Sequence, residues 1–142
     1  MTNSELVHRW FDRLWGQAIE ATIDEMMAPG IIAHGLSPEP MVGRAAFHEF
    51  YRNFRNSFPT VEVSVDELVD VGDRVSFRAR ARVTTADGRG PFELNGSGFL
   101  RVANDQFVEG WNYWDFLSLM TQMGAVPADA MTMALTAAAA RP

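Results

Sequence analysis

The chain has 142 residues, of which 47% are hydrophobic and 21% charged, and this composition fits one globular domain. The net charge of −6 argues against nucleic-acid binding, and the absence of cysteine excludes disulfides and thiolate metal sites. Three scattered histidines form no metal motif, no apolar run is long enough to span a bilayer, and no signal peptide is evident, so we expect a cytoplasmic protein without metal or membrane contact.

Helical signals dominate the first part of the chain. Thr2 and Glu5 have the spacing of a capping box, and Thr22 and Glu25 repeat it. The apolar residues that follow recur at helical spacing. The predicted helices cover residues 3–17, 22–27, 44–57 and 116–124, and the Ala- and Met-rich residues 128–140 either form a helix or fray.

Alternating apolar and polar residues dominate the second part. Short strands are predicted at residues 31–34, 61–65, 74–86, 92–102 and 107–115. Asp87-Gly88 and Asn104-Asp105 mark the turns between the last three strands. The order, helices first and then strands, predicts an α+β fold in which helices cover one face of a curved antiparallel sheet.

The two turns predict how the strands pair. The first turn places Arg82 opposite Glu93 and Ala79 opposite Gly96. The second places Trp111 opposite Gly98, Tyr113 opposite Gly96, and Asp115 opposite Leu94. One face of the sheet is then apolar, with a patch of small residues at its centre: Ala79, Ala81, Gly96 and Gly98.

Small residues leave a gap where a packed core would need side chains. Either helix side chains fill this gap or a ligand does, and the glycines could also serve only to let the sheet curve. Trp111, Tyr113 and Asp115 are predicted to surround it, beneath the helix that carries Phe50 and Phe54. Apolar walls with few polar groups are typical of a pocket for a small hydrophobic organic ligand.

Two stretches resemble the SnoaL-like polyketide cyclases of the ketosteroid-isomerase-like superfamily. The first comprises Ile31-Ile32-Ala33-His34, Gly43 and Ser57-Phe58-Pro59; the second is residues 107–115, followed by Leu119, Gln122, Met123 and Gly124. The resemblance implies a cone-shaped α+β barrel over residues 3–127, with 128–142 as a tail, and a homodimer. It also implies cofactor-independent cyclisation or isomerisation, although the family's His-x-Gly is here Ala86-Asp87-Gly88.

Asp115 is the predicted general acid/base. A carboxylate against aromatic walls has a raised pKa, which suits proton transfer next to a carbonyl. Asp115 is equally placed to cap the helix that begins at Phe116, and the two roles are compatible. The resemblance implies that His34 assists as a proton shuttle or donor, whereas a lone histidine is otherwise a core residue.

Other polar residues have open roles. Tyr51 could donate to a substrate oxygen, although core packing is the simpler interpretation. Glu109 is predicted to point inward, towards either a cation or the pocket rim. Arg78, Arg80 and Arg82 share the outer face of the sheet, where they form a solvated face or a dimer interface.

Two other functions compete with the cyclase. Limonene epoxide hydrolase shares the fold but uses an inward Arg-Asp pair, and the matching positions here are Ala79 and Ala81, which makes hydrolysis the weaker alternative. A ligand-binding domain without enzymatic activity is the stronger one, because fold alone does not determine function.

Overall fold

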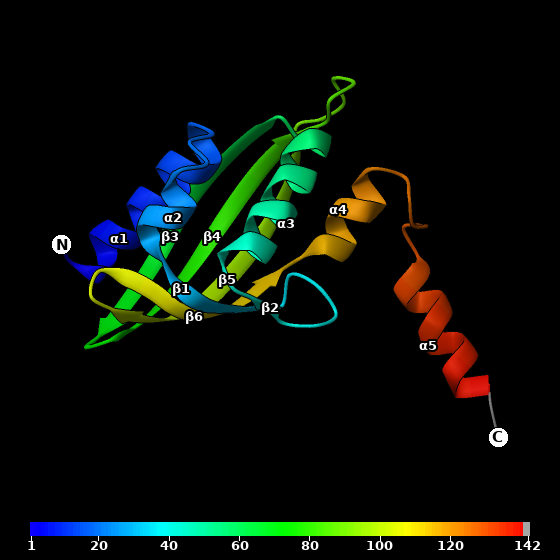
Figure 1. Cartoon of the computed structure of the whole chain (residues 1–142). Coiled ribbons are helices and arrows are strands. Elements are labelled where there is room, and N and C mark those ends of the chain that lie inside the picture. The colour runs from blue at the N-terminus through cyan, green and yellow to red at the C-terminus, as the bar shows by residue number, and fades with distance from the viewer. Residues whose placement is uncertain (141–142) are drawn as a thin grey trace.

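The computed structural model describes residues 1–140, in which helices cover one face of a curved sheet (Figure 1). The helical elements are α1 (Asn3–Arg9), the π-helix η1 (Trp10–Gly16), α2 (Thr22–Met26), α3 (Arg44–Ser57), α4 (Phe116–Gln122) and α5 (Ala130–Ala140). The strands are β1 (Met27–His34), β2 (Met41–Val42), β3 (Thr60–Val71), β4 (Arg74–Thr84), β5 (Phe92–Ala103) and β6 (Gln106–Trp114). The predicted α+β class is confirmed.

The sheet has the order β2-β1-β6-β5-β4-β3. All neighbouring strands are antiparallel except β1 and β6, which run parallel. The edge strands β2 and β3 do not pair with each other, so the sheet is curved without closing into the barrel that the resemblance implied.

The predicted first helix is two elements. The capping box of Thr2 and Glu5 is present and starts α1. From Trp10 onward the turns widen into a π-helix, and at its end the Gln17 amide donates to the Asp12 carbonyl five residues earlier (2.8 Å). No proline or glycine stands near Trp10, where the π-helix begins, that would have signalled this change; the glycine of the segment is its last residue, Gly16.

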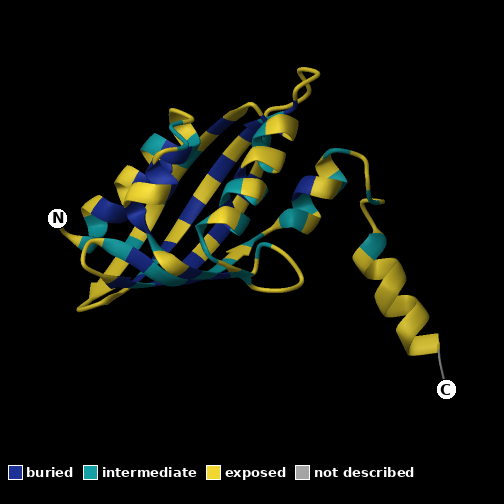
Figure 2. Cartoon of the chain, viewed as in Figure 1, coloured by how far each residue is buried: buried dark blue, intermediate teal, exposed yellow. Residues whose placement is uncertain are grey.

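Helix α3 has the predicted bounds, and the C-terminal Ala- and Met-rich stretch is helical as α5 up to residue 140; residues 141–142 of the predicted tail lie outside the described residues. Helix α5 has no buried residue and projects from the domain (Figure 2). Within residues 1–140, no helix is both long and apolar enough to cross a membrane.

The register between β4 and β5 is as predicted: Arg82 faces Glu93 and Ala79 faces Gly96. The Asn104-Asp105 turn is also present, and both residues have positive φ angles, of 53° and 57°. The predicted register between β5 and β6 is wrong by one residue, because Asn112 faces Gly98 and Trp114 faces Gly96 in the structure.

A bulge in β6 causes this difference. Arg101 pairs with Glu109 and Val102 pairs with Phe107, so Val108 has no partner on β5. One extra residue reverses the faces of every residue that follows it. Beyond the bulge, the helix-covered face of β6 therefore carries Gly110, Asn112 and Trp114 instead of Trp111, Tyr113 and Asp115.

Rings from the sheet fill the gap that the small residues leave. A Cβ atom on Gly96 would lie 2.2 Å from the Trp114 ring, and one on Gly98 would lie 2.4 Å from the Phe77 ring. Ala79 of β4 pairs with Gly96 and is buried. The two glycines of the patch are therefore covered by aromatic side chains, and of its four residues Ala81 alone lines the cavity described below.

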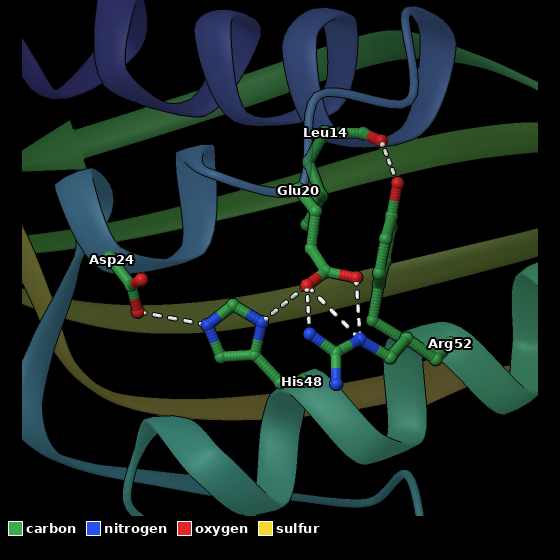
Figure 3. A network of polar contacts seen from close by, with 6 residues as sticks. Leu14, Glu20, Asp24, His48 and Arg52 are labelled. Atoms are coloured by element: carbon green, nitrogen blue, oxygen red, sulfur yellow. Dashed lines mark hydrogen bonds and ion pairs between the residues drawn. The ribbon is translucent and has the colours of Figure 1, made fainter.

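A polar network holds α3 against the segment that leads into α2 (Figure 3). Glu20 accepts from Arg52 Nη2 (2.7 Å) and from His48 Nδ1 (3.0 Å), and Asp24 accepts from His48 Nε2 (2.8 Å). Beside this network the Tyr51 hydroxyl donates to the Leu14 carbonyl (3.0 Å), which ties the same helix to η1.

We predict that Gly96→Ala destabilises the fold by about 1–3 kcal/mol, because the added methyl group must displace the Trp114 ring. Urea unfolding followed by circular dichroism measures the change. Gly30→Ala is the matched control in β1, where an added Cβ meets no atom within 4 Å, and we expect a change within about 0.5 kcal/mol. Equal stabilities of the two variants would contradict the packing of Trp114 on Gly96.

We predict that Glu20→Gln makes the free energy of unfolding less sensitive to acid. The hydrogen bond from Arg52 holds the pKa of Glu20 below its usual value of 4.5. A carboxyl with a lowered folded-state pKa contributes stability that is complete above its unfolded pKa and disappears as the pH falls through the folded value. Urea titrations between about pH 5 and pH 3 should show that the wild type loses stability more steeply than Glu20→Gln. Glu49 is exposed on α3, and Glu49→Gln should behave as the wild type does.

Candidate functional site

An apolar cavity of about 90 Å³ lies between the helices and the sheet. Side chains from η1, β1, α3, the strands β3–β6 and the start of α4 enclose it. Aromatic rings form much of the wall, among them Trp10, Phe11, Trp15, Phe50, Phe54 and Trp114. In the described chain, none of the residues lining this cavity is Asp, Glu, His, Arg or Tyr.

The π-helix supplies one side of this wall. Trp10, Phe11 and Trp15 all line the cavity, although Trp10 and Trp15 are five residues apart. An α-helix turns residues five apart towards different faces, whereas the wider π turn aligns them. Trp15 then packs edge-on against Tyr51 (5.2 Å) and Phe54 (5.4 Å) of α3.

Among the described residues, Asn112 is the one lining residue with an amide, hydroxyl or charged side chain. Its Nδ2 group donates to the backbone carbonyl of His34 on β1 (3.1 Å). Within residues 1–140, no donor is bonded to its side-chain carbonyl oxygen. Sequence analysis missed Asn112 because the predicted register turned it outward.

Asp115 lies outside the cavity, which corrects its predicted place at the pocket floor. Its side chain is exposed and accepts from the Ser118 amide (3.0 Å), so it caps α4. Its neighbours Trp114 and Phe116 do line the cavity, which leaves Asp115 beside the wall. The capping role is confirmed, and the catalytic role stays a prediction.

Trp111, Tyr113 and His34 also lie on the outer face of the sheet, contrary to the predicted inward positions. Tyr113 is 65% exposed. Trp111 stacks on His34 with ring centroids 5.1 Å apart and an interplanar angle of 8°. The bulge explains why Trp111 and Tyr113 of β6 point outward. His34 points outward because side chains alternate along β1, where Ile31 and Ala33 are buried.

Glu109 likewise faces outward, where it has two hydrogen-bonding partners. It accepts from His34 Nε2 (2.8 Å) and from Arg101 Nη2 (3.3 Å). The hydrogen bond from His34, followed by that from Arg101, holds the pKa of Glu109 below its usual range. The carboxylate is therefore an ionised structural partner on the outer face and cannot serve the cavity.

The remaining predicted residues divide between wall and core. Phe50 and Phe54 line the cavity, as their helical spacing predicted. Tyr51 is buried in the core, and burial raises the pKa of its hydroxyl, which donates to Leu14. Gly96 and Gly98 lie against Trp114 and Phe77, and Ala79 pairs with Gly96. None of the three is among the residues that line the cavity in the described part of the chain.

The basic row on β4 lies on the outer face, as predicted. Arg80 donates to Asp66 (2.9 Å), and the exposed side chains of Arg78 and Arg80 both lie near this carboxylate. Whether this face also meets a second copy stays a prediction. Among residues 1–140, no cluster of three His, Asp or Glu side chains could hold a metal ion.

Comparison with known proteins gives the family. The profile of the SnoaL-like polyketide cyclases matches residues 5–123. A protein from Jannaschia sp. CCS1 described as a SnoaL-like polyketide cyclase has 25% identity and a TM-score of 0.75, with 88% of this chain and 93% of that one covered. No curated protein matches.

Two further solved structures share the fold. IdmH from Streptomyces antibioticus has 23% identity and a TM-score of 0.72, over 85% of this chain and 97% of that one. A ketosteroid-isomerase-like protein from Catenulispora acidiphila, solved with trimethylamine, has 21% identity and a TM-score of 0.75, over 91% of this chain and 98% of that one. The profile match covers well over half of the sequence, and the chain therefore belongs to the SnoaL-like polyketide cyclase family.

Proposed function

We propose that this chain binds a small, uncharged, apolar molecule in its aromatic cavity without contributing an acid or a base to it. The observation that carries the proposal is the lining itself, which has one amide, from Asn112, and no titratable group among the described residues. An ionised ligand would lose its hydration there without gaining a counter-charge, at a cost of several kcal/mol. Apolar rings lose nothing comparable and gain contact with the walls.

Acid/base cyclisation or isomerisation is the second candidate, and family membership favours it. Asp115 remains the carboxylate beside the wall, because its two chain neighbours line the cavity. To reach a ligand, its side chain must leave the Ser118 amide and turn past Trp114 or Phe116. The candidate therefore requires a rearrangement at the start of α4, which the binding proposal does not.

We predict that Asp115→Asn keeps the ligand affinity of the wild type within about twofold, since asparagine also caps helices and the cavity is unchanged. Trp10, Trp15 and Trp114 line the cavity, so quenching of indole fluorescence by an apolar ring compound such as toluene measures binding. Exchange of acidic C–H protons with deuterated solvent, for a panel of small cyclic ketones, measures proton transfer. Exchange that the wild type catalyses and Asp115→Asn abolishes would contradict the proposal and establish the acid/base candidate.

We predict that Asn112→Asp creates a carboxyl with a pKa above the ordinary value of about 3.9, because the aromatic cavity disfavours its charged form. A raised folded-state pKa means that the charge destabilises the fold. Stability relative to the wild type should therefore fall as the pH rises from about 4 through the raised value. Unfolding experiments across this range test the prediction, and Asn53→Asp, at an exposed site on α3, should show no such fall.

A further inference from the structure

The amide of Asn112 has a fixed orientation. Its Nδ2 group is engaged by the His34 carbonyl (3.1 Å), so the side-chain carbonyl oxygen is left for a ligand. This oxygen only accepts hydrogen bonds, and a group that binds it must donate one. Lost hydration of the oxygen is recovered only if the ligand supplies that donor.

The carbonyl that fixes the amide is itself held in place. On the outer face His34 is stacked on Trp111 and donates to Glu109 (2.8 Å). The next residue, Gly35, passes so close to β6 that a Cβ there would lie 1.9 Å from the Asn112 backbone oxygen. Strands β1 and β6 are thus held together at the point where the Asn112 side chain donates its hydrogen bond to His34.

The size of the cavity limits the ligand. An engineered apolar cavity of about 150 Å³ holds one benzene ring. The cavity of 90 Å³ is smaller, so a single six-membered ring with a small substituent is the upper limit for its ligand, and fused rings need more space. The absence of a counter-charge in the lining requires the ligand to be neutral.

We infer that the cavity selects a neutral single-ring hydroxyl compound of the phenol class, whose O–H group donates to Oδ1 of Asn112. This inference rests on the proposed function, since it names the ligand class of the same cavity. Asn112 is then the residue that determines specificity. The aromatic walls of the cavity supply the part of the affinity that does not depend on the hydroxyl group, and toluene should share that part.

Phenol, anisole and toluene test the inference on the wild type and on Asn112→Leu. Indole fluorescence and calorimetry measure their affinities at neutral pH. We expect the ratio of phenol affinity to toluene affinity to fall about fivefold in Asn112→Leu, which corresponds to the loss of one hydrogen bond of about 1 kcal/mol. On the wild type, phenol should bind more tightly than anisole, which keeps the ring and oxygen but has no donor. That comparison remains decisive if Asn112→Leu fails to fold.

The possible outcomes separate the inference from the function on which it rests. Binding of all three rings without preference, in both proteins, would overturn the hydroxyl inference and leave the binding function intact. Tighter binding of 2-naphthol than of phenol would overturn the single-ring limit, and binding of benzoate at neutral pH would overturn the requirement for neutrality. No binding of any ring compound would overturn the proposed function itself.

Discussion

The bulge at Val108 decides which side chains of β6 enter the cavity. Phe107, before the bulge, and Gly110, after it, are both buried although they are three positions apart, whereas a regular strand turns such residues to opposite faces. Without the extra residue, Glu109 and Asp115 would face the aromatic walls as two carboxylates without partners. The bulge turns both carboxylates to the surface, where Glu109 meets His34 and Arg101 and Asp115 caps α4.

The cavity walls depend on a second departure from regular geometry, the wide turn of η1. Because Trp10 and Trp15 both face inward, this one segment contacts α3 at two places, through Phe47 (5.6 Å) and Phe54 (5.4 Å). The network around Glu20 and His48 ties the same helix to the segment that follows η1. The volume of the cavity is therefore set by a helix that is fixed at several points along its length, which favours a ligand of defined size over a broad set of ligands.

Local patterns predicted the parts of the fold that follow one regular period. The bounds of helix α3 and the β4–β5 register were predicted correctly because helical spacing and strand alternation determine them. Residues 85–91, and not the predicted two-residue turn, connect β4 and β5. The bulge and the π turn each add a single residue, and neither has a local signature. The β6 pattern did contain a signal in its charges, since the predicted face buried two carboxylates while the opposite parity buried none.

The same two departures explain how a member of this family can keep its fold while the chemistry of its cavity changes. The inward positions of β6 beyond the bulge are Gly110, Asn112 and Trp114, and the first and third serve packing against Leu100 and Gly96. Asn112 makes neither of these two packing contacts. A change of side chain at position 112 therefore alters the chemistry of the cavity and leaves both contacts in place. The backbone carbonyl of His34 orients this amide, and the side chain of His34 is bonded to Glu109 on the outer face. A contact on one face of the sheet thus helps to position a neutral group on the other. On the proposal made above, the choice of ligand by this cavity accordingly depends less on the shared architecture than on the residue at this one inward position.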